Sequence, residues 1–284
     1  MNEFIEAART FPLLQRALLT GLLASIACGV VGSYVVVRRI SYLAGGIAHC
    51  VLGGMGAAVY LRKVHHFQSL QPLHGALAAA LLAGLVIGLV SMRFRQREDT
   101  VISALWAVGM ASGVLFIWGT PGYQEDLMSY LFGNITMVSA KDLWLIAGLD
   151  AMVVLAAALF HRQLLAVCFD EEFARTRGLH VERYYLMLLA LTALTVVLLV
   201  TVVGIVLVIA LLTLPVAAAG HFCRRLWQMM VVSAVLSAVL TTAGLAISYS
   251  PELPAGAVTV ILAGTVYLLV LIVKVPLRRL RAGR

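Results

Sequence analysis

Residues 184–220 read YYLMLLALTALTVVLLVTVVGIVLVIALLTLPVAAAG, a run of 37 residues without a charged side chain. A helix rises 1.5 Å per residue, so one straight helix of this length would reach about 55 Å. The hydrocarbon core of a bilayer is only about 30 Å thick. Gly204 and Pro215 offer places where the helix could break. The run therefore predicts either two membrane crossings or one tilted helix followed by a partial segment.

The composition extends this prediction to the whole chain of 284 residues. Hydrophobic residues make up 62% of it and charged residues 12%, against about 45–50% and about 25% in a soluble domain. A soluble domain of this length could not cover so much apolar side chain, and intrinsic disorder requires low hydrophobicity. We therefore predict an all-α fold, a polytopic transmembrane helical bundle of eight to nine membrane segments. Residues 1–284 are expected to form a single membrane domain.

Further apolar runs lie on both sides of this stretch, separated by short polar breaks. Each is long enough for one helical crossing, which takes about 20 residues. The runs are 14–37, 42–61, 73–92, 101–119, 142–160, 227–248 and 255–275.

The basic residues indicate which side each polar break faces. If the breaks after 38, 93, 161 and 221 and the C-terminal tail face the cytoplasm, that side holds 16 of the 21 Lys and Arg residues. Such a bias is the positive-inside pattern of membrane proteins. It predicts the N-terminus outside, the C-terminus in the cytoplasm and an odd number of crossings. Nine crossings satisfy this parity if the long run folds back near Gly204, and eight full helices plus one short segment is the alternative.

Charge and motifs exclude several classes of function. The net charge of +8 follows from the positive-inside bias, so it does not indicate nucleic acid. The four cysteines are scattered without a C-x-x-C pair, which argues against a disulfide scaffold or a cysteine zinc site. The chain lacks G-x-x-x-x-G-K-[ST], so it cannot be its own ATPase, and it also lacks H-E-x-x-H and G-x-S-x-G.

His49 is the clearest ionisable residue deep in an apolar run. Gly45, His49, Gly53 and Gly56 are spaced i, i+4, i+8 and i+11, so they share one helix face. Small residues on one face let another helix approach closely. An intramembrane ionisable residue suggests function, and an imidazole in a tight seam suits a transition metal. The alternative is a histidine hydrogen-bonded to a neighbouring carbonyl purely for packing.

Three more histidines lie together in the predicted outside loop after the second run. His65, His66 and His74 could gather a metal weakly at an entrance. Solvated loop side chains are the alternative interpretation.

The predicted inside loop 161–183 contains the sequence FDEEFARTRG at 169–178. Asp170 suits an N-cap, Glu171 and Glu172 fill a first turn, and Gly178 suits the stop after Arg177. The pattern predicts a short capped helix, which suits docking to a soluble partner. A solvated connector is the alternative.

Four blocks of this sequence, spread over nearly its whole length, resemble the membrane permease subunits of bacterial ABC importers for zinc, manganese and iron. The third block has that family's F-D-x-x-x-A-x-x-x-G pattern, and the first has its arginine-led second helix with a single histidine. The blocks are RRISYLAGGIAHCVLGG (38–54), YLFGNI (130–135), FDEEFARTRGL (169–179) and VGIVLVIALLTLP (203–215).

The resemblance implies a homodimeric, multi-pass permease of the bacterial cytoplasmic (inner) membrane. Its implied partners are a second copy of itself, two cytoplasmic ABC ATPase subunits, an extracytoplasmic metal-binding protein and membrane lipid. ATP would bind only the ATPase subunits, and no cofactor would be bound permanently, with a divalent metal as the cargo. The implied ATPase-coupling residues are Phe169, Asp170, Glu171, Glu172, Ala174, Arg177 and Gly178. The implied metal ligand at the dimer seam is His49, and the implied helix seam around the metal path consists of Gly45, Gly46, Gly53 and Gly56.

One departure from the family bears on the metal. Many members carry an aspartate four residues before the histidine, where this chain has Gly45. An imidazole site without that carboxylate suits zinc better than manganese by ligand type. Two copies of His49 supply only two ligands, so other groups, water or the binding protein must supply the rest. The expected function is ATP-driven zinc import by alternating access. Manganese or iron import and a stand-alone metal channel or secondary carrier are the alternatives.

Overall fold

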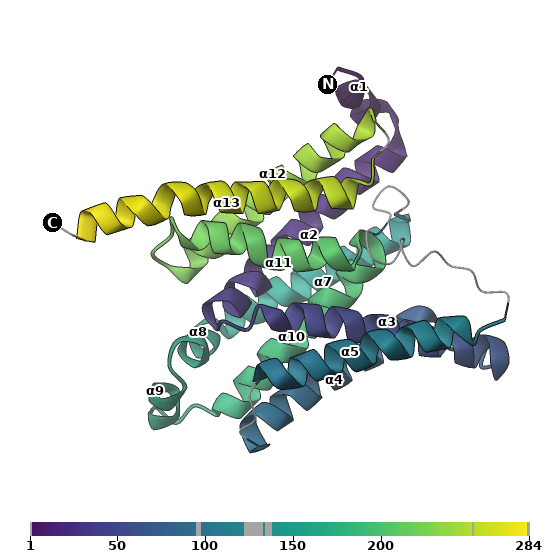
Figure 1. The fold of residues 1–284 in the computed structure, drawn as a ribbon, viewed down its shortest axis with the longest axis horizontal. Coiled ribbons are helices and arrows are strands. Elements are labelled where there is room, and N and C mark those ends of the chain that lie inside the picture. Colours follow the sequence, from purple (N-terminus) through teal and green to yellow (C-terminus); the bar gives the residue numbers. More distant parts are fainter. Residues whose placement is uncertain (1, 95–97, 122–132, 134–137, 252, 283–284) are drawn as a thin grey trace.

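The computed structural model describes residues 2–94, 98–121, 133, 138–251 and 253–282. Every regular element within these ranges is a helix, which confirms the predicted all-α class (Figure 1). Eight of the helices are long and apolar enough to cross a membrane, so the chain is a multi-pass membrane protein. They are α2 (Pro12–Val37), α3 (Tyr42–Val64), α4 (Pro72–Phe94), α5 (Glu98–Trp118), α7 (Ala140–Leu159), α10 (Val181–Val203), α12 (Leu226–Tyr249) and α13 (Ala255–Ala282).

Four shorter helices complete the described chain. An N-terminal helix precedes α2, two short helices occupy the loop between α7 and α10, and one apolar helix follows α10. They are α1 (Asn2–Thr10), α8 (His161–Phe169), α9 (Glu171–Thr176) and α11 (Ile205–Gly220). The block 130–135 lies outside the described residues except for Gly133.

The long apolar run is divided at Gly204. This residue ends α10 and precedes α11, with φ +90° and ψ 157°, a conformation open essentially to glycine alone. Pro215 lies inside α11 and does not end it. The 16 residues of α11 rise only about 24 Å. The structure thus shows eight long helices plus one short segment, and the odd number of crossings stays a prediction with α11 as the ninth.

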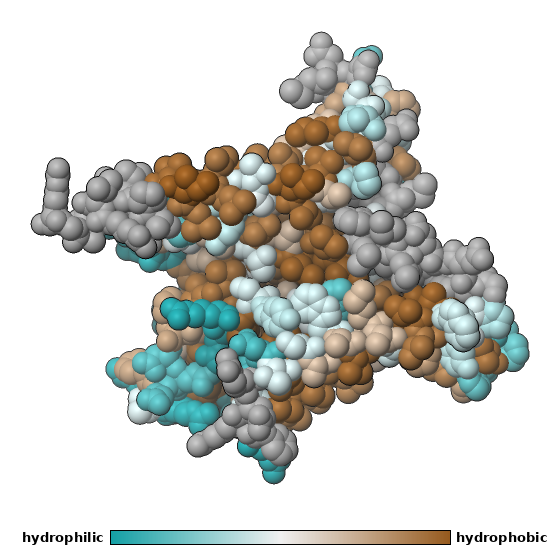
Figure 2. All heavy atoms as spheres, in the orientation of Figure 1, coloured by the Kyte–Doolittle hydropathy of each residue, from teal (hydrophilic) through white to brown (hydrophobic). Residues whose placement is uncertain are grey.

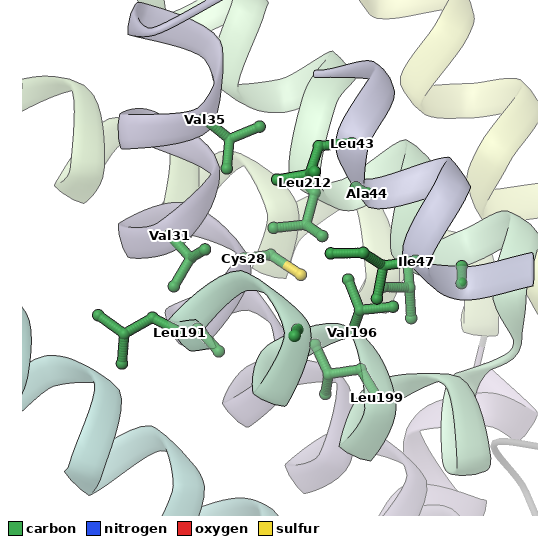
Figure 3. Close-up of a cluster of buried hydrophobic side chains, with 14 of the residues drawn as sticks. Cys28, Val31, Val35, Leu43, Ala44, Ile47, Leu191, Val196, Leu199 and Leu212 are labelled. Carbon is green, nitrogen blue, oxygen red and sulfur yellow. The ribbon is translucent and has the colours of Figure 1, made fainter. Parts of the chain in front are cut away.

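The bundle is centred on α3. Of the most apolar 18-residue window of each helix, 83% is buried in α3 but only 11% in α5. Side chains from α2, α3, α10 and α11 point into one apolar cluster (Figure 3). The labelled members are Cys28, Val31, Val35, Leu43, Ala44, Ile47, Leu191, Val196, Leu199 and Leu212.

Polar residues gather at one end of the bundle. Figure 2 shows hydrophilic side chains concentrated around the end that carries α8 and α9, whereas the flanks of the long helices are hydrophobic. Hydrogen bonds there join residues at the C-terminal ends of α2 and α4 to residues at the starts of α5, α9 and α10. The ends of α2 and α4 can meet the starts of α5 and α10 only if consecutive spanning helices run in opposite directions. The predicted topology has this alternation. The charge bias assigns this end to the cytoplasm.

Candidate functional site

The glycine face of α3 packs against α5 of the same chain. A β-carbon at Gly53 would lie 2.7 Å from the carbonyl oxygen of Gly109 and 2.8 Å from Oγ of Ser112. A β-carbon at Gly56 would lie 3.0 Å from the carbonyl oxygen of Gly113. Gly53 therefore admits only hydrogen if the two helices keep this separation, and a side chain at Gly56 would require its neighbours to shift by a few tenths of an ångström. The predicted tight seam is present, and its second wall is α5.

The other end of the same face is closed by larger side chains of α5. A β-carbon at Gly46 would lie 2.6 Å from Cγ2 of Ile102, and one at Gly45 would lie 3.1 Å from Cζ3 of Trp106. Ile102 and Trp106 are one turn apart on α5. All four glycines of the predicted seam therefore contact a single neighbouring helix.

His49 lies within this seam, between the two pairs of glycines. Its side chain is 7% exposed, and its ring stacks on Trp106 with centroids 4.5 Å apart and planes at 16°. Its Nδ1 is buried and has no hydrogen-bond partner. The neighbouring thiol of Cys50 donates to the carbonyl of Leu105 at 3.3 Å. A buried imidazole nitrogen without a partner is costly unless it has a ligand to bind.

One chain supplies no complete metal cluster in the part that the structure describes. No group of three His, Cys, Asp or Glu side chains there could hold an ion. His65 and His66 directly follow α3, about four turns beyond His49. His74 lies in the first turn of α4, where its Nδ1 accepts the backbone N–H of Gln71 at 3.2 Å. A site at His49 therefore needs ligands from outside this set, as a second copy, water or a delivered ion complex would provide.

The 169–178 segment has the predicted capped conformation. Asp170 accepts the backbone N–H of Phe173 at 2.9 Å, and Gly178 follows α9 with φ +75°. Ala174 is fully buried, whereas Phe169 is 68% and Phe173 is 53% exposed. Phe169 ends α8 and Phe173 lies in α9, so two exposed aromatic rings flank the corner between the two helices. Exposed aromatic rings suit contact with another protein. Phe173 was not among the predicted coupling residues, although it lies within the predicted segment 169–178.

Arg38 connects this segment to the spanning helices. Its guanidinium forms an ion pair with Glu171, donates to the carbonyl of Val167 at 2.8 Å and lies 4.8 Å from the ring centroid of Tyr185. The Tyr185 hydroxyl in turn donates to Glu98 at 2.9 Å. The sequence placed Arg38 in the charge bias and at the head of the first family-like block, but its partners could not be foreseen because they are more than 100 residues away.

Cys168 lies beneath this network. Burial raises the pKa of its thiol to about 12, while the nearby Arg38 acts in the opposite direction and Glu171 raises it further. At the start of the same helix, α8, Nδ1 of His161 shares a hydrogen bond of 2.9 Å with the hydroxyl of Tyr34 on α2. The helices α2, α8 and α9 are therefore tied by several polar contacts at one end of the bundle.

Two blocks of the sequence meet at the other end. Gly133 lies so close to the backbone of Val203 and Gly204 that a β-carbon there would overlap it. Gly133 has φ +66°. The YLFGNI block therefore contacts the break between α10 and α11 through its glycine.

A helical membrane bundle with a tightly packed intramembrane seam and a short capped helix at one end suits an integral-membrane transport subunit. Residues 10–274 match the ABC 3 transport family, and the chain belongs to that family. This match confirms the resemblance drawn from the four sequence blocks.

Known proteins agree with this assignment over nearly the full chain. The chain is 39% identical over 263 residues to a Chlamydia trachomatis protein named "Probable metal transport system membrane protein", covering 93% of this chain and 89% of the other. It is 32% identical over 269 residues to the manganese import system permease protein ScaB of Streptococcus parasanguinis, covering 95% and 93%. Its fold is similar to the structure of PsaBC from Streptococcus pneumoniae in complex with Fab, with a TM-score of 0.86, 31% identity and coverage of 100% and 99%.

Proposed function

We propose that this chain is the membrane permease of an ATP-driven importer for a divalent transition metal, with zinc as the first candidate. Membership of the ABC 3 transport family supports the transport role, and relatives named for metal and manganese transport support the cargo class. The observation that carries the proposal is His49, a buried imidazole with an unpartnered Nδ1 in a glycine-lined seam.

The ligand type favours zinc. Gly45 contributes no carboxylate one turn before His49, and imidazole nitrogen suits zinc better than it suits a hard ion. Manganese is the second candidate because the Streptococcus parasanguinis relative, which aligns with 95% of the chain, is named a manganese import permease.

The proposed mechanism is alternating access in an assembly with partners. Two copies of the chain would bring two His49 side chains to the metal path, and an extracytoplasmic metal-binding protein would deliver the ion. Two cytoplasmic ATPase subunits would hydrolyse ATP, since the sequence has no P-loop of its own. The residues 169–178 would dock on an ATPase, and Arg38 would pass the movement of α9 to α2 and α10.

The test is metal uptake by the assembled complex in proteoliposomes, measured with zinc and with manganese. We expect H49A to abolish uptake of the favoured metal while the complex still assembles and its ATPase still turns over. The matched control is H74A, which removes a histidine in the first turn of α4 whose Nδ1 accepts the backbone N–H of Gln71, and which should leave uptake unchanged. Native uptake by H49A would refute the proposal, and uptake without any ATPase would support a stand-alone channel or carrier instead.

A further inference from the structure

An aromatic residue of α5 lies across the face of α3 that carries His49. The ring of Trp106 stacks on His49 with centroids 4.5 Å apart, and its distance to the ring of Tyr42 is 5.3 Å at 39°. Tyr42 and His49 are seven residues apart on α3, so they lie on the same face two turns apart. The indole therefore bridges two rings of one helix face.

Gly45 is what allows the indole to lie there. It occupies the turn between Tyr42 and His49, and a β-carbon at this position would lie 3.1, 3.5 and 3.6 Å from three carbons of the Trp106 six-membered ring. A β-carbon alone would already require the ring to move by a few tenths of an ångström. A longer side chain at position 45 and an indole at position 106 therefore compete for the same space.

The stacked arrangement leaves the metal-binding electrons of the imidazole free. A metal binds an imidazole nitrogen in the plane of the ring, whereas Trp106 covers a face of it. The planes differ by only 16°, so the indole limits ring rotation without blocking either nitrogen. A metal-bound imidazole is electron-poor, and an electron-rich indole face is a favourable neighbour for it.

We propose that Trp106 is a positioning and specificity-determining residue for the metal site at His49: its indole orients the imidazole and excludes an oxygen ligand from position 45. The site then presents nitrogen without a carboxylate beside it, which selects borderline transition metals over hard ones. This inference rests on the proposed function, because it concerns the selectivity of the same site.

The first test compares variants at position 106 by zinc and manganese uptake in proteoliposomes of the assembled complex. We expect W106L to raise the KM for zinc by about tenfold, the range found when a residue supporting a metal ligand is lost, with kcat and ATPase turnover retained. W106F keeps an aromatic face and should stay within about threefold of the native KM. The matched control is W144L, which removes an indole that is 81% exposed on α7 and should leave KM unchanged.

The second test uses the competition for space between positions 45 and 106. We expect G45D to impair uptake of both metals, because its side chain collides with the indole. G45D/W106A should recover uptake, with the preference shifted toward manganese by about tenfold or more, since a carboxylate oxygen has joined the site. A purely structural role for Trp106 predicts that W106L leaves the ratio of zinc to manganese uptake unchanged.

A wrong metal site and a wrong role for Trp106 give different results. If H49A transports both metals normally, the proposed site itself is wrong. If H49A loses uptake but W106L and G45D/W106A keep the native KM and metal preference, the role of Trp106 is wrong and the site stands. If W106L does not assemble, W106M takes its place, because it fills the same space with a flexible side chain and without an aromatic face. The same tenfold rise in KM is expected, and a native KM would overturn the role of Trp106.

Discussion

Arg38, the C-cap residue of α2, forms an ion pair with Glu171 in the first turn of α9. The same guanidinium donates to the carbonyl of Val167 at 2.8 Å and stacks over the ring of Tyr185 at 4.8 Å. One side chain at the end of α2 thus contacts α8, the proposed docking helix α9 and the spanning helix α10. If a partner displaced α9, the contacts of Arg38 would transmit the displacement to α2 and α10.

The first prediction concerns this ion pair. We expect E171Q and R38A each to lower the transport-linked stimulation of the ATPase, because α9 then moves without drawing α2 and α10 with it. The Glu171 side chain is 37% exposed, so loss of the pair should cost only about 1 kcal/mol of stability. The measurement is ATPase turnover of the assembled complex with and without the metal-loaded binding protein.

A neighbouring acid provides the control for the ion pair. Glu172 lies in the same first turn of α9 and is exposed, so E172Q changes the same charge without touching the Arg38 pair. E172Q should retain more stimulation than E171Q, because only E171Q breaks the pair with Arg38, and the swapped pair R38E/E171R should recover part of the loss. Equal losses in E171Q and E172Q would show that only the charge of the helix matters.

The second prediction concerns the thiol under α9. With its pKa raised to about 12 by burial, about one Cys168 thiol in ten thousand is ionised at pH 8, against about one in ten at the usual pKa of 9.0. Maleimide labelling of the native protein, followed by peptide mass spectrometry, should therefore find Cys168 labelled far more slowly than Cys223. The Cys223 thiol also has a raised pKa but is less deeply buried.

The pH dependence of this thiol has a definite sign. The folded state holds the neutral thiol, so its stabilising effect is complete below about pH 9 and declines as the pH rises toward 12. Labelling of Cys168 should increase with pH in proportion to the thiolate, and detergent unfolding should make it equal to Cys223. Equal labelling in the native protein at pH 7 would contradict the packing of α8 beneath α9.

The sequence predicts those features of the fold that depend on local pattern. Apolar runs locate seven of the eight membrane spans to within a few residues and the start of the eighth, α10, and the capping pattern of 169–178 identifies α9. The glycine spacing around His49 correctly predicts a tight seam. These signals are local because helix length, caps and helix faces are set by neighbours in the chain.

What the sequence could not show depends on contacts between distant segments. Nothing local to Trp106 indicates that its ring lies on His49, 57 residues earlier, or that it fills the space beside Gly45. The partners of Arg38, Glu171 and Tyr185, lie even farther along the chain. The sequence narrowed the break in the long apolar run to Gly204 or Pro215. The backbone decides between these two residues, because Gly204 has a positive φ and ends α10, whereas Pro215 lies inside α11.

The third prediction tests the separation of α3 and α5. G53A should destabilise the protein by about 1–3 kcal/mol, because the new methyl group meets a carbonyl that belongs to a rigid helix. Thermal unfolding in detergent, followed by tryptophan fluorescence, measures the change. G148A is the matched control, since nothing lies within 4 Å of a β-carbon there. If both variants unfold at the same temperature, α3 and α5 are not held at this distance.

The fourth prediction concerns the break between α10 and α11. At φ +90° and ψ 157°, G204A should cost about 1–3 kcal/mol, because an L-residue is strained in this region. G264A in α13 is the control, as its β-carbon would meet nothing within 4 Å and its φ is not positive. G204A should also alter transport, since straightening the break would lengthen α10 into a span too long for the bilayer.

Gly133 makes this last prediction more specific. Because its backbone lies against Val203 and Gly204, G133A and G204A disturb one contact, and their destabilisation should be less than additive by about 0.5 kcal/mol or more. Both glycines also have positive φ, so strain at each position is expected on its own. Strict additivity in the double variant would mean that each glycine is needed only for its own backbone conformation. A shortfall would show that the YLFGNI block holds the α10–α11 break in place, which local strain alone cannot produce.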